Sequence, residues 1–146
     1  MKLYLGSGQK RLPGYTHVDI RPGPTVDVVH DLNRLPWPWE NDSAEIIVAE
    51  DLVEHLAINL LEFCDEAWRV VRPGGELFIR TPHHAGVSSW IDPTHRWHLH
   101  EQSFQYVDPD SYWGRTFPHY TERKWSLVSL GVRGPQNIHA LLIPRK

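Results

Sequence analysis

The sequence predicts an α/β fold with a mostly parallel β-sheet that ends in an antiparallel hairpin. Short apolar segments alternate with turn residues through the first fifty positions, and the run from Ile46 to Val48 is continuously apolar, as in a strand buried on both faces of a parallel sheet. A stripe of helical period follows, and the last two apolar segments are separated only by residues 133–136. Strands that alternate with crossovers and end in a hairpin are typical of an α/β sandwich.

The predicted strands are short apolar runs bounded by Gly, Pro or Asp, a pattern that marks strand ends. They cover Lys2–Leu5, Thr16–Asp19, Val26–Val29, Ala44–Ala49, Glu76–Arg80, Trp125–Val132 and Asn137–Ile143. From Leu52 to Val70 apolar residues recur at spacings of three and four, which predicts one amphipathic helix that ends before Arg72. Residues 83–123 are rich in His, Trp and Pro, and we expect them to form an ordered insertion or lid within a single domain, 1–146.

The first crossovers are too short to hold a packing helix. The connections from Leu5 to Thr16 and from Ile20 to Val26 lie near or below the usual minimum length for joining parallel strands. The sequence therefore predicts a Rossmann-like sheet whose first crossover helices are shortened or missing, with one face uncovered. Either the insertion folds back over that face or a second copy of the chain covers it, and we favour a homodimer through the uncovered face.

Composition limits the possible classes of protein. The chain has 146 residues and a formal net charge of -3, which gives no general attraction to nucleic acid. Its one cysteine, Cys64, has no partner, so a disulfide framework and a cysteine-based zinc site are excluded. No apolar run approaches bilayer length and no leader pattern precedes the first strand. We expect a cytoplasmic protein that binds neither membrane nor nucleic acid.

A glycine turn after the first strand indicates a nucleotide site. Gly6 and Gly8 allow the backbone to bend tightly and to approach a ligand, and Asp19 ends the next strand, where a carboxylate can accept hydrogen bonds from ribose hydroxyls. Asp31 and then Glu50 or Asp51 follow the next two strands. Because the carboxyl ends of parallel strands meet at one edge of a sheet, we expect these carboxylates to share a crevice.

Beyond these individual signals, the chain resembles the class I S-adenosylmethionine-dependent methyltransferases, in particular short type 11 members. Four segments carry the resemblance in order: Leu5–Gly8 with Leu12–Gly14 and Val18–Asp19; Val28–Leu32; Ala49–Leu56; and Trp68–Gly75. Tyr4 stands where that family often has an acid, and the third glycine of its loop is absent.

The resemblance implies transfer of a methyl group from S-adenosylmethionine to an unidentified small-molecule or glycan acceptor, at oxygen or nitrogen. By matching position, Gly6, Ser7 and Gly8 would border the methionyl portion of the cofactor. Asp19 would hold the ribose, Asp31 and Leu32 would flank the adenine, and Glu50 and Asp51 would close the pocket. The departure at Tyr4 and the short glycine loop favour the alternative of a catalytically silent, methyltransferase-like binding module.

The histidines supply candidate general bases and a further alternative. His83 and His84 follow the fifth strand and are predicted as the base ahead of His55, because neutral imidazole accepts protons near neutral pH. Asp92, His95, His98 and His100 match no strong metal-binding spacing, so no metal is predicted and a metal-dependent enzyme is the least favoured hypothesis. Asp92 is instead expected to cap a turn with Thr94.

Overall fold

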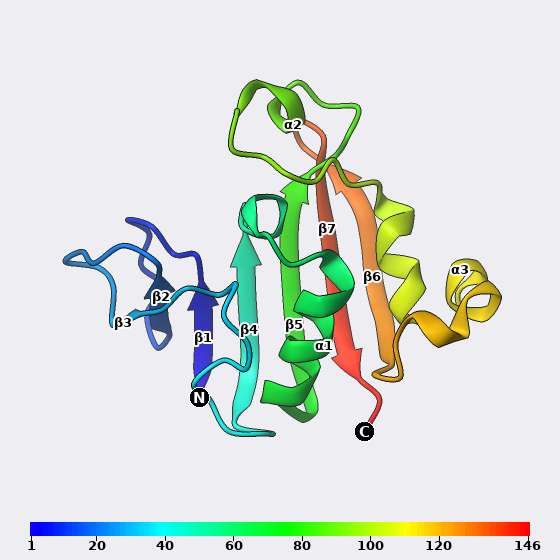
Figure 1. Cartoon of the computed structure of the whole chain (residues 1–146), viewed down its shortest axis with the longest axis horizontal. Coiled ribbons are helices and arrows are strands. Elements are labelled where there is room, and N and C mark those ends of the chain that lie inside the picture. Colours follow the sequence, from blue (N-terminus) through cyan, green and yellow to red (C-terminus); the bar gives the residue numbers. More distant parts are fainter.

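The computed structural model describes residues 1–146 and contains one sheet with the strand order β3-β2-β1-β4-β5-β7-β6 (Figure 1). β1 through β5 pair in parallel, and β7 runs antiparallel to both β5 and β6. The strands are β1 (Lys2–Leu5), β2 (Thr16–Asp19), β3 (Val28–Val29), β4 (Ala44–Glu50), β5 (Val71–Pro82), β6 (Trp125–Arg133) and β7 (Asn137–Pro144). The predicted mostly parallel sheet with a C-terminal hairpin is confirmed.

One face of the sheet holds the core. Its side chains alternate along the strands and are fully buried; they include Leu3, Leu5, Ile47, Ala49, Leu77, Ile79, Ala140 and Leu142. Helix α1 (Leu60–Val70) and the 3₁₀ helix η2 (Glu101–Val107) lie over this face, in front of the sheet in Figure 1. They bury Phe63 and Phe104 in the same hydrophobic cluster.

On the opposite face Tyr4, His17 and Val48 are buried, whereas Phe78 and Leu141, further along the sheet, are only half-buried. The insertion does not fold back over this face. Its buried residues Phe104 and Val107 belong to the core beside α1, which excludes this one of the two alternatives. The reason is that the 83–123 segment returns to β6 on the side of the sheet already occupied by α1, where it extends an existing core.

The helix predicted from Leu52 begins instead at Leu60. Residues Val53–His55 form a short 3₁₀ helix, η1, and Leu56 is extended. Asn59 then sets the start of α1, because its side chain accepts hydrogen bonds from the N–H groups of Leu61 and Glu62 while the Glu62 carboxylate accepts from the N–H of Asn59. The apolar spacing continues across this break, so periodicity alone did not reveal it.

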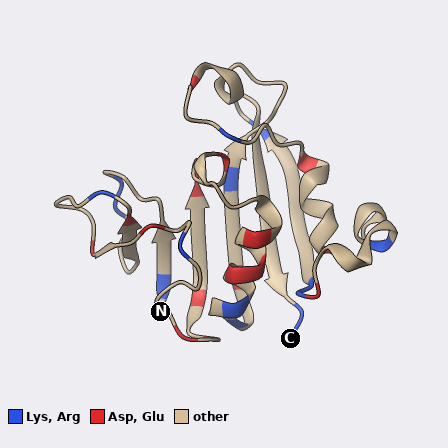
Figure 2. Ribbon diagram, viewed as in Figure 1, with Lys and Arg blue, Asp and Glu red and all other residues tan.

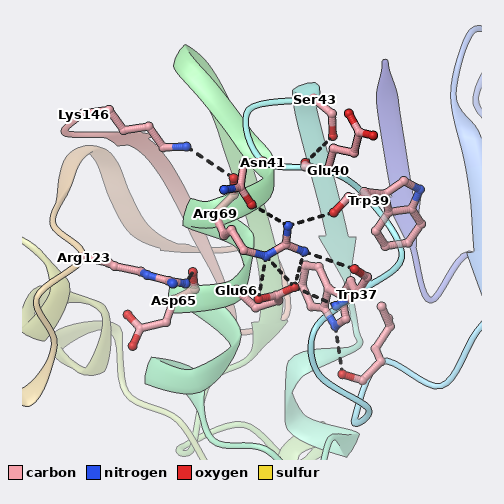
Figure 3. Close-up of polar contacts among 11 residues, drawn as sticks. Trp37, Trp39, Glu40, Asn41, Ser43, Asp65, Glu66, Arg69, Arg123 and Lys146 are labelled. Atoms are coloured by element: carbon pink, nitrogen blue, oxygen red, sulfur yellow. Dashed lines mark hydrogen bonds and ion pairs between the residues drawn. The ribbon is translucent and has the colours of Figure 1, made fainter.

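The crossover from β3 to β4 contains no helix and is held to α1 by a polar network (Figure 3). The Arg69 guanidinium pairs with the Glu66 carboxylate and donates to the backbone carbonyls of Trp37 (3.1 Å) and Trp39 (2.8 Å). Glu66 also accepts the N–H of Trp37 at 2.7 Å. Trp37, 2% exposed, packs edge-to-face on Phe63 and thereby fills space that a crossover helix would otherwise occupy.

The remaining helices are short: α2 (Ser88–Ile91), α3 (Tyr112–Thr116) and η3 (Pro118–Tyr120). No helix combines the length and the apolar character that crossing a membrane requires. Figure 2 shows basic residues spread over loops, strands and α1, and acidic residues at the carboxyl ends of β2 and β4, which are Asp19 and Glu50.

Replacing Arg69 with Ala should lower the free energy of unfolding by about 3 kcal/mol, because it leaves the buried Glu66 carboxylate without its cation. Urea unfolding followed by tryptophan fluorescence measures this change. Arg72→Ala is the matched control, since Arg72 is exposed, and should change stability by no more than about 0.5 kcal/mol. A loss below about 1 kcal/mol in Arg69→Ala would show that the network does not hold the crossover.

Candidate active site

The glycine turn after β1 has the backbone geometry that the sequence predicts. Gly6 and Gly8 have φ values of 63° and 55°, in the left-handed region that favours glycine. The N–H of Ser7 donates to the Val18 carbonyl at 3.0 Å, which fastens the turn to β2. A Cβ at Gly6 would lie 2.8 Å from Cδ1 of Leu52, whereas a Cβ at Gly8 would meet nothing within 4 Å. Gly6 therefore allows Leu52 to lie directly against the turn.

Asp19 joins the turn to the end of β2. It is 9% exposed, and its two carboxylate oxygens accept the N–H of Gly8 at 2.9 Å and the N–H of Arg21 at 3.0 Å. Each carboxylate oxygen has a second lone pair, so Asp19 retains acceptor capacity for a ligand. The predicted carboxylate is thus held rigidly by backbone groups beside the glycine turn.

Three cavities adjoin one another along the carboxyl edge of the parallel strands. The middle cavity measures about 170 Å³ and shares Asp19 with a cavity of about 440 Å³ beside Gly8. It shares His55 with a third cavity of about 600 Å³. The middle cavity is lined by Gly6, Asp19, Ile20, His30, Asp31, Leu32, Asn33, Leu52, His55 and Leu56. Asp19 and His55 thus make the three cavities direct neighbours along this edge, which we call the crevice.

Several of these lining residues were not predicted. Ile20 is apolar but 59% exposed. Its position directly after Asp19 is the one feature of the sequence that could have placed it at this site. Asn33 joins the loop after β3 to the segment before α1, because its Oδ1 accepts the N–H of Ala57 at 2.6 Å. Neither the partner of Asn33 nor the position of His30 follows from local sequence.

The crevice contains polar atoms suited to a nucleoside ligand. The Nε2 of His30, which lines the middle cavity, is buried without a hydrogen-bond partner. The Oγ of Ser7 in the adjoining turn is also buried without a partner, but Ser7 lines none of the three cavities. Buried polar atoms are normally paired, so such atoms beside a cavity indicate a missing polar partner. With the acceptor capacity of Asp19 and the apolar side chains of Ile20 and Leu32, this donor and acceptor set fits an adenosine group.

Glu50, the last residue of β4, and Asp51 both contact the Arg80 guanidinium, but only Asp51 lines a cavity. Glu50 accepts hydrogen bonds from the Tyr4 hydroxyl at 2.7 Å and from Lys10 at 3.2 Å, and it lines none of the three cavities. Burial raises the pKa of Glu50, but its contacts with Tyr4, Arg80 and Lys10 outweigh that effect and hold the pKa below its usual value. Asp51 pairs with Arg80 and lines the cavity of about 600 Å³.

This third cavity is open and is lined by polar and apolar groups together. Its walls come from the segment after β4, from the loop around α2 and from the turn between β6 and β7; they comprise Asp51, Glu54, His55, Pro82, Val87, Ser88, Ile91, Asp92, His95, Pro135 and Asn137. Asp92 accepts the N–H of Thr94 at 2.8 Å, which confirms the predicted capped turn. That turn places His95 against His55, with ring centroids 4.5 Å apart.

The predicted histidines fall into two groups. His55 lines the crevice, whereas His83 and His84 gather with His100, and Glu101 lies 2.7 Å from Nε2 of His83. His95 is grouped with His55 and Glu54 rather than with His98 or His100. Within the His55 group, burial raises the pKa of Glu54, and burial together with His95 lowers the pKa of His55.

Comparison with known proteins supports the family resemblance that the sequence indicates. Residues 9–79 match the type 11 family model that is described as a methyltransferase domain. A stretch of 88 residues, 60% of the chain, is 35% identical to a protein of Mycolicibacterium smegmatis named "Probable S-adenosylmethionine-dependent methyltransferase". The chain covers only 30% of the length of that relative.

Solved structures show the same fold. A SAM-dependent methyltransferase from Archaeoglobus fulgidus superposes with a TM-score of 0.67 at 14% identity, over 99% of this chain and 85% of that one. A SAM-dependent methyltransferase from Aquifex aeolicus gives 0.62 at 14% identity, over 97% and 80% of the two chains. At these identities the likeness concerns the fold alone.

Gly6→Ala should destabilise the chain by about 1 kcal/mol more than Gly8→Ala, because both force alanine into the left-handed region but only the Gly6 variant meets Leu52. Chemical unfolding measures both variants. In a Leu52→Ala background the difference should shrink, since Cδ1 and Cγ of Leu52 are gone and only its Cβ, 3.2 Å away, remains. Equal losses for the two variants in the presence of Leu52 would contradict this packing at the turn.

Proposed function

Because the chain belongs to the class I S-adenosylmethionine-dependent methyltransferases, we propose that it transfers a methyl group to a small-molecule or glycan acceptor bound in the cavity of about 600 Å³. The observation that supports this proposal most strongly is that the three cavities are neighbours. Asp19 and the glycine turn lie at the middle cavity, and His55 joins that cavity to the larger one. A cofactor-binding part and an acceptor-binding part are therefore adjacent.

The residues of the middle cavity would hold the cofactor, which when bound supplies a methyl group on a positively charged sulfur. Asp19 would accept hydrogen bonds from the ribose hydroxyls, and Ile20, Asp31 and Leu32 would border the adenine. The buried Ser7 hydroxyl and the glycine turn would border the methionyl portion. Asp51, at the boundary with the larger cavity, would close the site, while Glu50 supports the turn through Tyr4 and Lys10.

The large cavity supports a polar acceptor. Its wall carries carboxylate, imidazole, hydroxyl and amide groups beside the apolar side chains of Pro82, Val87, Ile91 and Pro135. Such a lining matches the hydroxyl-rich surface of a sugar or of another hydroxylated small molecule. Positioning the acceptor in line with the methyl group supplies most of the catalysis in such a transfer.

Deprotonation of a hydroxyl acceptor would involve the wall formed by Glu54, His55 and His95. Of the three histidines predicted as the base, His55 is the one that lines this cavity. His83 and His84 remain predictions, since they lie in the separate group with His100 and Glu101. A general base must lie within hydrogen-bonding reach of the proton that it removes, which favours His55 in this arrangement.

The alternative is a silent module that binds the cofactor without turnover, and Tyr4 in place of an acid favours it. The two functions differ in one measurement. Incubation with S-adenosylmethionine and a panel of sugars and phenols, with S-adenosylhomocysteine quantified by mass spectrometry, should show acceptor-dependent product for an enzyme. Binding without any product over the whole panel would favour the silent module, and absence of binding at millimolar cofactor would contradict both.

The uncovered sheet face supports a second copy as partner. Phe78 and Leu141 lie on that face and are half-buried. Helices α1 and η2 cover the other face of the sheet. We propose that this face forms the homodimer predicted above. Sedimentation equilibrium should then give twice the chain mass of 17.0 kDa, whereas a monomer at all concentrations would contradict it.

Ile20→Ala should weaken binding of S-adenosylhomocysteine about tenfold, because a lost apolar contact of this size is worth about 1.4 kcal/mol. Ile20 is exposed in the free protein, so its replacement should leave the unfolding temperature unchanged. Val29→Ala is the matched control: Val29 is also exposed and lies outside the crevice. Isothermal titration calorimetry measures the affinities, and equal affinities for both variants and the original chain would contradict the assignment.

Asp19→Ala should lower the affinity for S-adenosylhomocysteine by about tenfold to a hundredfold, because hydrogen bonds to a charged group contribute about 1.5–3 kcal/mol. Asp19 also holds Gly8 and Arg21, so circular dichroism must first confirm that the variant is folded. Unchanged affinity in a folded variant would exclude Asp19 as the ribose ligand.

A further inference from the structure

Three groups with lone pairs meet at the wall of the large cavity. Glu54, His55 and His95 each offer one ligating atom, and these atoms all lie within 4.8 Å of one another. Glu54 and His55 come from η1 after β4, and His95 comes from the turn after α2. Their hydrogen bonds show which atoms remain available.

The Nδ1 atom of His55 carries the ring proton. It lies 3.0 Å from Oγ1 of Thr94, and that hydroxyl donates its only proton to Oδ1 of Asp92 at 2.7 Å. Because a hydroxyl that has donated its proton can only accept, His55 must be the donor in the first contact. Nε2 of His55 therefore keeps its lone pair.

His95 has the same tautomer. Its Nδ1 lies 3.0 Å from the backbone carbonyl of Ser89, which can only accept a hydrogen bond. In the neutral ring Nε2 therefore has a lone pair, and the nearest charged group, Oδ2 of Asp92, lies 3.7 Å away, beyond hydrogen-bonding distance. A histidine that donates one N–H to a carbonyl or hydroxyl and presents the other nitrogen is the usual arrangement of a metal ligand.

Glu54 completes the set from below the cavity wall. It is 1% exposed, and one carboxylate oxygen accepts the Thr81 hydroxyl at 2.8 Å. The other oxygen, Oε1, is buried and has no hydrogen-bond partner. A buried carboxylate oxygen without a donor is costly, so the site contains acceptors that require a positively charged or donating group among them.

We propose that Glu54, His55 and His95 bind one divalent transition-metal ion, for which we take zinc as the example. Two imidazole nitrogens and one carboxylate form a ligand set that zinc accepts with a fourth position open, and the open position here would face the acceptor cavity. This step rests on the proposed function, because it assigns the open position to an acceptor oxygen. With the ion bound, His55 would be a ligand and no longer the general base, and the metal would instead lower the pKa of the acceptor hydroxyl so that solvent can take its proton. Metal binding itself does not depend on that function.

The second histidine group is a weaker candidate and supplies the control. In that group, Nε2 of His83 is bonded to Glu101 at 2.7 Å and Nδ1 accepts the N–H of Ala85 at 3.2 Å, so both ring nitrogens are occupied. His100 belongs to the same group and is more exposed, with 44% of its side chain accessible. The structure thus favours the group at the cavity wall.

Calorimetric titration of Zn²⁺ into EDTA-treated and desalted protein, together with the visible spectrum of the Co²⁺ form, tests the site. We expect one ion per chain and the intense absorption of four-coordinate Co²⁺. His95→Ala should lower the affinity for Zn²⁺ at least about a hundredfold, and Glu54→Gln at least about tenfold. Even mutation of residues that only support metal ligands lowers metal affinity about tenfold to a hundredfold. His100→Ala should bind as the original chain does.

Loss of Zn²⁺ binding in His100→Ala with retention in His95→Ala would overturn the assignment, as would no binding at micromolar Zn²⁺ by the original chain. Folding of each variant is checked by its affinity for S-adenosylhomocysteine in EDTA, since Asp19 and Ile20 lie outside the metal ligands. That second titration separates the two proposals: cofactor binding without zinc binding contradicts the metal site alone, and zinc binding without cofactor binding contradicts the methyltransferase function alone.

Discussion

The parallel pairing of β1 with β2 on one side and with β4 on the other determines where the candidate functional residues lie. Leu3 pairs with both Thr16 and Ile47, so the three strands are in register and end at one edge. The glycine turn, Asp19 and the η1 segment all follow directly from those ends. Any shift of register would separate Asp19 from the N–H of Gly8 and divide the crevice.

This sheet is stable with few helices because loop side chains fill the space over it. The crossover from β3 to β4 places Trp37 against Phe63, and the Glu66–Arg69 pair satisfies the backbone of the same crossover (Figure 3). The insertion contributes Phe104 beside α1. The main hydrophobic core thus lies on one side of the sheet. Because the fold contains few helices, part of the opposite side stays open to contact with a partner.

Local rules predicted the parts of the site that depend on local sequence. Gly6, Gly8 and Asp19 were found because a tight turn and a strand-terminal carboxylate each have a short sequence signature. The start of α1 was missed because the apolar spacing runs across Asn59, whose cap determines where the helix begins. The group of Glu54, His55 and His95 could not be predicted, since His95 is brought to it by the path of the insertion and the tautomers depend on Thr94 and Ser89.

The carboxyl edge of β1 and β2 is expected to bind S-adenosylmethionine beside the larger cavity. Two-dimensional amide NMR with added S-adenosylhomocysteine tests this binding most directly, because glycine signals are well separated. We expect saturable shifts of the amide signals of Gly6 and Gly8. The signals of Gly74, in the distorted start of β5, and of Gly131, in β6, should not shift. Absence of shifts at millimolar ligand, or shifts centred on Gly74 or Gly131, would contradict binding at this edge.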